Sequence, residues 1–160
     1  SNPFQIGFAR QVMRMLDPSH LIAYEAAQDG LLMRAQNEEA LARPVALLRD
    51  VYGDDLVLLP PQVRYMSLGN RPYEPIMLLR VRTAPRHLDA VREDLVAREA
   101  TLLEEHARPS VCVLRAEAPL RKLLGYGEAL AKLSEGAALH WIWLDRYAPM
   151  TSPPPDGQAA

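Results

Sequence analysis

The chain contains 160 residues, which is enough for one or two compact domains with an ordinary buried core. Hydrophobic residues make up 49% and charged residues 24%, the proportions of a soluble globular protein. The formal net charge of -2 excludes a uniformly basic nucleic-acid binder, although 18 Lys and Arg residues can still gather on one face. The single cysteine, Cys112, excludes an internal disulfide and fits a cytoplasmic location. No apolar run approaches the roughly 20 residues that span a bilayer, so no membrane partner is expected.

The chain begins with patterns that predict a helix followed by a hairpin. Apolar residues at helical spacing favour a helix over 4–16, and Asp17-Pro18 should end it. Asp29-Gly30 is a strong tight-turn signal between two short apolar segments, which predicts two antiparallel strands.

A second helix and a closing strand are expected next. Asn37 can cap a helix that begins at Glu38, because its side-chain oxygen can accept a backbone hydrogen bond. Pro44 falls inside that helix and predicts that the helix kinks or restarts there. The apolar segment 55–65 is predicted to be the last strand of this half.

The segment 67–75 is predicted to join two domains. Pro72 and Pro75 disfavour a helix, and Gly69-Asn70 favours a tight turn. We therefore expect a first domain over 1–66, a linker over 67–75 and a second domain over 76–150. The proline-rich tail, 151–160, lacks apolar anchors and is expected to be disordered.

The second half predicts the order strand, helix, strand, strand, helix, strand. Alternating apolar residues indicate strands and helical spacing indicates helices. The predicted strands are 76–84, 101–107, 110–118 and 138–147, and the predicted helices are 85–100 and a helix from Pro119 to about Gly136. This βαββαβ order is the ferredoxin-like, split-βαβ arrangement. The first half repeats it without its first strand, as αββαβ, so the predicted fold class is α+β with two ferredoxin-like domains.

The last strand carries two tryptophans two residues apart. If Ile142 and Leu144 point into the core, period two places Trp141 and Trp143 on the other face of the sheet. The first strand places two arginines outward in the same way. The candidate partner or RNA contact is therefore Arg80, Arg82, Trp141 and Trp143. Such a face suits packing against the first half or a second copy of the chain, or a stacking platform for RNA.

No pattern of catalytic or metal-binding residues is present. The four histidines lack the spacing of metal ligands, and the neighbouring acids should diverge on their own elements. Gly125 and Gly127 are interpreted as positions where a helix packs closely on the sheet, and Cys112 as a packing residue. No catalytic, cofactor or metal site is predicted in this chain.

Residues 74–147 resemble the fifth, C-terminal domain of bacterial elongation factor G. The resemblance is carried by "EPIM" at 74–77, by "APLRKLLGYGEALAKLSEG" at 118–136 and by "LDRY" at 144–147. Residues 17–66 resemble that factor's third domain. The short join over 67–75 resembles the related BipA/TypA and LepA GTPases, in which no fourth domain is inserted at this point.

The resemblance implies a ribosome-binding region of a translational GTPase that takes part in protein biosynthesis. GTP is expected only in an upstream domain, because the phosphate-loop motif GxxxxGK[ST] is absent from this sequence. The chain itself is therefore not expected to be an enzyme. The ribosome, through its rRNA and proteins, is the expected partner.

One departure from the family leaves an alternative open. Gly136-Ala137-Ala138 stands where the family usually has Gly-Arg-Gly, which removes a guanidinium fork suited to phosphate. The alternative is a free-standing, diverged protein-interaction module that no longer acts on the ribosome and dimerises through the open sheet face.

Overall fold

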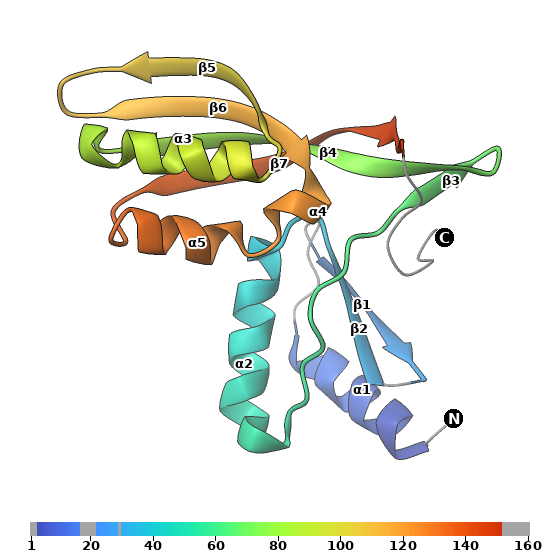
Figure 1. Cartoon of the computed structure of the whole chain (residues 1–160). Coiled ribbons are helices and arrows are strands. Elements are labelled where there is room, and N and C mark those ends of the chain that lie inside the picture. Colours follow the sequence, from blue (N-terminus) through green and yellow to red (C-terminus); the bar gives the residue numbers. More distant parts are fainter. Residues whose placement is uncertain (1–2, 17–21, 29, 152–160) are drawn as a thin grey trace. The chain divides into compact units, whose positions relative to one another are not determined.

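A computed structural model describes residues 3–16, 22–28 and 30–151, and the chain divides into two compact units, 1–61 and 62–160 (Figure 1). The tail expected to be disordered lies outside the described residues except for its first residue, Thr151. The secondary structure is mixed, with antiparallel sheets, which confirms the predicted α+β class.

The first unit begins with a helix and a hairpin, as predicted. Its elements are α1 (Pro3–Met15), β1 (Ile22–Ala27), β2 (Gly30–Ala35), η1 (Glu39–Leu41), α2 (Ala42–Tyr52) and η2 (Gly53–Asp55). β1 and β2 pair antiparallel, with Ala27 opposite Gly30. Val12, Leu16 and Leu48 are the buried centre of this unit.

The start of α2 follows the sequence closely. The Asn37 side-chain oxygen accepts a hydrogen bond from the backbone N–H of Ala40 at 2.9 Å. A short 3-10 turn, η1, comes first, and the α-helix begins only at Ala42. Pro44 therefore lies in the first turn of the α-helix, where its missing N–H costs no intrahelical hydrogen bond. The predicted restart near Pro44 is confirmed.

The predicted closing strand over 55–65 is wrong. Leu56 and Leu58 are half-buried while Val57 and Leu59 are exposed, which is the alternation of a strand, but this segment joins no ladder in the described structure. In the second unit the last strand, Leu139–Pro149, pairs with Arg71–Thr83, the strand that begins its βαββαβ order. The described part of the first unit has no such first strand, so the pairing that the last strand makes in the second unit has no counterpart for segment 56–59.

The predicted linker over 67–75 is instead a hairpin at the start of the second unit. β3 (Met66–Leu68) and β4 (Arg71–Thr83) pair antiparallel around Gly69-Asn70. Both turn residues have positive φ, at 56° and 61°, which is the geometry that a two-residue hairpin loop requires. The boundary between the units lies after Pro61, and β4, which corresponds to the strand predicted over 76–84, begins earlier than predicted.

The second unit has the complete ferredoxin-like order. After β4 come η3 (Pro85–His87), α3 (Leu88–Ala97), β5 (Thr101–Ala107), β6 (Cys112–Pro119), α4 (Leu120–Leu123), α5 (Tyr126–Leu133) and β7 (Leu139–Pro149). β4 is central, because it pairs antiparallel with β6 on one side and β7 on the other, and β5 pairs with β6. The predicted βαββαβ order is confirmed for this unit.

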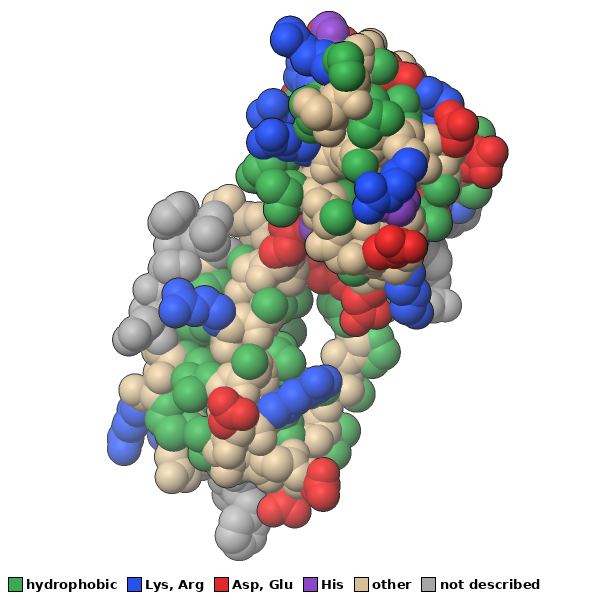
Figure 2. All heavy atoms as spheres, turned by 90° about the vertical axis from the view of Figure 1, so that its left-hand side faces the viewer, with side chains coloured by type: hydrophobic (Ala, Val, Ile, Leu, Met, Phe, Trp, Pro, Cys, Tyr) green, Lys and Arg blue, Asp and Glu red, His purple; other side chains and the backbone are tan. Residues whose placement is uncertain are grey.

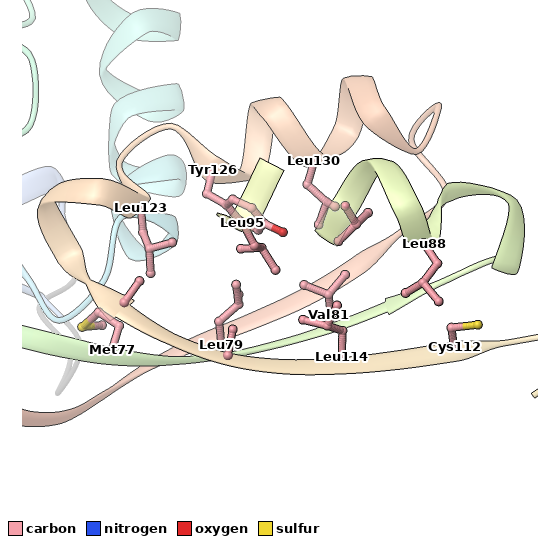
Figure 3. Close-up of a cluster of buried hydrophobic side chains, with 13 residues drawn as sticks. Met77, Leu79, Val81, Leu88, Leu95, Cys112, Leu114, Leu123, Tyr126 and Leu130 are labelled. Carbon is pink, nitrogen blue, oxygen red and sulfur yellow. The ribbon is translucent and has the colours of Figure 1, made fainter. Parts of the chain in front are cut away.

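Both long helices, α3 and α5, cover one face of this sheet (Figure 1). Their apolar side chains point onto those of the strands beneath (Figure 3). The buried core consists of Met77, Leu79, Val81, Leu88, Val91, Leu95, Cys112, Leu114, Ala116, Ala118, Leu123, Tyr126 and Leu130. Cys112 is among them, which confirms that it packs in the core.

The predicted helix from Pro119 is broken at Gly125. Gly125 has φ of +75°, a left-handed conformation that ends α4 and starts α5, and an added Cβ there would meet no atom within 4 Å. Its role is conformational, so the interpretation as a close-packing residue is wrong for Gly125. It holds for Gly127, where an added Cβ would lie 3.4 Å from Cε1 of His140 on β7.

Arg98, the residue that follows α3, stabilises the break between α4 and α5. Arg98 donates to the carbonyl oxygens of Lys122 at 2.9 Å and Leu124 at 3.5 Å, and it pairs with Asp94 at 3.0 Å. Its guanidinium carbon lies 5.2 Å from the ring centroid of Tyr126. Burial raises the pKa of Tyr126 and the nearby Asp94 raises it further, while Arg98 lowers it.

Replacing Tyr126 with phenylalanine is expected to leave the second unit as stable as before, or more stable by up to about 1–3 kcal/mol. The Tyr126 hydroxyl is buried and has no hydrogen-bond partner among the described residues, so the wild type carries the cost of desolvating it. Urea unfolding followed by tryptophan fluorescence measures the change. A loss of more than about 1 kcal/mol, the size of one hydrogen bond, would show that the hydroxyl does have a partner.

Candidate partner interface

The sheet of the second unit has one covered and one open face. Along β4, Met77, Leu79 and Val81 are buried against the helices, while Arg80 and Arg82 are exposed. The predicted outward direction of both arginines is confirmed by this alternation. We call the side away from α3 and α5 the open face; its residues on the four main strands include Leu78, Arg80, Arg82, Glu104, Val113, Arg115, Glu117, Leu139, Trp141 and Trp143.

Trp141 and Trp143 lie on this open face. Their exposed fractions are 44% and 40%, so large parts of both indoles remain in contact with water. Ile142, between them, packs on the core from the helix side as predicted. Leu144 does not, because 48% of it is exposed. Among the described residues β7 is an edge strand that pairs only with β4, and Leu144 lies beside the bulge at Ile76/Met77.

The strand register brings the four predicted residues together. Arg80 is directly opposite Trp141, and its guanidinium carbon lies 5.4 Å from the centroid of the indole ring, within the range of a cation–π contact. Arg82 lies opposite Leu139, and Trp143 lies opposite Leu78. The structure therefore places aromatic and guanidinium groups side by side on one surface.

Two further arginines on this face are paired with acids. Arg115 on β6 pairs with Glu104 at 3.3 Å. Arg146 on β7 pairs with Glu117 at 3.2 Å and Asp145 at 2.8 Å, and hydrogen bonds to those carboxylates raise its pKa.

The two predicted arginines lack such partners. Within the described part of the chain no carboxylate lies within 4.0 Å of Arg80 or Arg82. The space-filling view shows this unit from one side, with Lys and Arg side chains gathered at the upper left and others lying among acidic side chains at the centre and right (Figure 2). The open face thus has positive charge that the described residues do not neutralise.

Arg115 and Arg146 are functional candidates that the sequence reasoning missed. The signal was present, because β6 alternates buried and half-buried residues along its whole length. Arg115 has the outward parity of Val113 and Glu117, and the β4–β6 register sets it directly opposite Arg80. Only the register between strands, which sequence periodicity does not give, reveals that proximity.

The described residues contain neither a cluster of metal ligands nor a helix that could span a membrane. No cluster of three or more His, Cys, Asp or Glu side chains among them could hold a metal ion. His140 packs edge-on against Tyr126, with ring centroids 5.8 Å apart, and His87 is buried at the start of α3. Among these residues no helix has the length and apolar character to cross a membrane.

The four main strands β4 to β7, extended by the short β3, form an antiparallel sheet with two helices on one face, which defines the second unit as a ferredoxin-like α+β domain. The chain belongs to a particular family with this domain: the model of the elongation factor G C-terminus matches residues 71–157. The match covers every element from β4 to β7. The chain therefore contains the C-terminal region of an elongation factor G-like protein, which connects it to translation.

Curated proteins show the same relationship. The chain is 34% identical over 84 residues to the mitochondrial ribosome-releasing factor 2 of Danio rerio, covering 52% of this chain and 11% of that protein. It is 34% identical over 74 residues to elongation factor G of Pseudothermotoga lettingae, covering 46% and 11%. The matched region is thus a small part of each relative's length.

A crystal structure of a protein from Thermus thermophilus shares the fold. It aligns with a TM-score of 0.67 at 17% identity, covering 94% of this chain and 40% of that one. The likeness includes most of the first unit as well as the second.

Proposed function

We propose that this chain is the ribosome-binding C-terminal region of an elongation factor G-like translation factor and works in the cytoplasm. The single observation that carries the proposal is the family match over 71–157, which includes strands β4 to β7 of the second unit and both helices that cover them. The relatives are translation proteins by name, and in them this region is a small part of a longer chain.

In this proposal the chain contributes binding and no catalysis. The matched model describes the C-terminus of the factor, and the sequence contains no GxxxxGK[ST] phosphate loop. GTP would then be bound by another domain of the factor. The first unit, with its α1–β1–β2–α2 order, would serve as the counterpart of the factor's third domain.

We place the ribosome contact on the open face. Large exposed aromatic side chains on a soluble domain usually mark a contact surface, and Trp141 and Trp143 are such residues. Arg80 and Arg82 beside them add charge that suits the anionic surface of a ribosome. Burying one indole removes on the order of 150–250 Å² from water, so the pair can contribute much of the binding energy.

The test is co-sedimentation of the full chain with bacterial ribosomes through a sucrose cushion. We expect the wild type to sediment with ribosomes at low salt, and Trp141→Ser/Trp143→Ser to stay in the supernatant. A matched control is Val51→Ser/Val96→Ser, which removes two exposed apolar side chains from helices and should sediment like the wild type.

Each result has a defined meaning. Failure of the wild type to sediment would contradict the proposed function. Sedimentation of the tryptophan variant at the wild-type level would leave ribosome binding standing and move the contact away from the open face. Self-association that the tryptophan variant abolishes, without sedimentation, would favour a free-standing interaction module.

A further inference from the structure

The charged residues of the open face are arranged to favour an anionic partner. Arg80 on β4 lies directly opposite Arg115 on β6, and Arg82 lies two residues further along β4 on the same face. Like charges directly opposite each other on a sheet are destabilising. Glu104 neutralises Arg115, while Arg80 and Arg82 have no carboxylate within ion-pair distance in the described structure. The centre of the face therefore keeps two guanidinium groups, those of Arg80 and Arg82, with which a bound anion would pair.

The same face carries two flat aromatic groups at a regular spacing. Trp141 and Trp143 lie two residues apart on β7, a separation of about 6.5–7 Å along a strand. Neighbouring bases of an unstacked single strand can be splayed apart to stack on aromatic side chains, and any base offers a π-face for this contact. The guanidinium of Arg80 already lies over the Trp141 ring, which holds this arginine on the face.

We propose that the open face binds single-stranded RNA, with bases stacked on Trp141 and Trp143 and phosphates held by Arg80 and Arg82. The proposal rests on the proposed function, and it identifies single-stranded RNA as the component of the ribosome that this face recognises. Single-stranded RNA fits better than a duplex, because only unpaired bases expose their flat faces to side chains.

A protein partner fits this face less well. Tryptophan and arginine are enriched in protein interfaces as well, but the two arginines on the central strand have no acidic partner among the described residues. A nucleic-acid strand supplies a phosphate at every nucleotide for them to bind. A second copy of the chain is less favourable still. A two-fold dimer through the open face would bring the same patch of each subunit together, arginines included.

The tryptophans themselves provide the assay, because the chain has only these two. Ten-nucleotide RNAs of uridine, of adenosine and of mixed sequence would be titrated into the full chain while tryptophan emission is recorded. We expect saturable quenching by all three RNAs, because stacking tolerates any base. Anisotropy of fluorescein-labelled RNA would then give the affinity of variants that lack tryptophan.

Two variants separate stacking from phosphate binding. Trp→Ser at position 141 or 143 should weaken RNA binding by roughly fivefold to 150-fold for each tryptophan. Arg80→Ser/Arg82→Ser keeps both tryptophans and should lower the slope of log affinity against log salt by about 1.4, the loss of two phosphate contacts. The control Arg10→Ser/Arg14→Ser removes the same charge from exposed positions of α1 and should leave affinity and slope unchanged.

Unchanged emission at saturating RNA would overturn the proposal, and so would an equal loss of affinity in the α1 control. Self-association through the tryptophans without RNA binding would assign the face to a second copy instead. Ribosome sedimentation keeps the two proposals apart. A chain that sediments with ribosomes but binds no oligonucleotide disproves only the RNA contact, and one that binds oligonucleotides but no ribosomes disproves only the ribosomal function.

Discussion

Replacing Leu114 with alanine is expected to lower the free energy of unfolding of the second unit by about 2–5 kcal/mol. Leu114 is fully buried in β6, directly opposite Val81 on the central strand β4. The helices α3 and α5 cover it from above (Figure 3). Such a site cannot collapse easily onto the space left by the lost methyl groups, because rigid strands and helices surround it. The cost therefore includes a cavity as well as the lost transfer of the side chain from water.

Urea unfolding followed by tryptophan emission measures this change, because both tryptophans lie on β7 and report on the second unit. The matched control is Leu144→Ala on β7. This leucine has 48% of its surface exposed, so its removal should cost less than about 1 kcal/mol. Equal losses for the two variants would contradict the core described here and would place Leu144 in it.

The fold of the second unit could be predicted from its sequence because each element has a clear period. Alternation along β4 and β6 distinguishes buried from outward residues, and the helices between them have apolar stripes. The break at Gly125 could not be predicted in the same way. Apolar spacing continues across it, and the left-handed φ that ends α4 is a single local event.

The first unit shows where such prediction fails. Residues 56–59 alternate like a strand, and the sequence pattern carries no further information about pairing. A strand needs a partner backbone, which can come from a distant part of the chain. The described part of this unit lacks the first strand with which a last strand pairs in the second unit, so the alternation of residues 56–59 did not produce a strand.

The candidate site was predictable to the same extent. The alternation of side chains along a strand is enough to place Arg80, Arg82, Trp141 and Trp143 on one face of the sheet, and the structure has them on that face. The pairing of Arg80 with Trp141 and its opposition to Arg115 depend on the register of β4 with both neighbours. The exposure of Leu144 depends on a bulge and on the position of β7 at the edge of the sheet. These are non-local facts that the period of one strand does not contain.

Replacing Arg121 with methionine is expected to destabilise the second unit by about 2–3 kcal/mol, somewhat below the 3–5 kcal/mol typical of breaking a fully buried pair. Nε of Arg121 in α4 donates to Oε2 of Glu74 in β4 at 2.9 Å. The Glu74 side chain is only 10% exposed, so the variant leaves a carboxylate with little access to water and no cationic partner. Arg121 is 31% exposed, which lets water reach part of the vacated space and reduces the loss.

The double variant Glu74→Gln/Arg121→Met tests this explanation. It removes both charges, so it should be more stable than Arg121→Met alone, because the largest cost is the unpaired carboxylate and not the missing bond. Arg115→Met breaks the exposed pair with Glu104 and serves as the control, with an expected loss below about 1 kcal/mol.

The pKa of Tyr65 provides a second test of the pair formed by Glu74 and Arg121. Burial and Glu74 raise the pKa of the nearby Tyr65, and Arg121 lowers it. Removing Arg121 should therefore raise the pKa of Tyr65 further, which an alkaline titration of phenolate absorbance compares between the variants. If the double variant is no more stable than the single one, the carboxylate of Glu74 is not the source of the cost. The contribution of Arg121 would then come from the packing of its aliphatic stem against its neighbours.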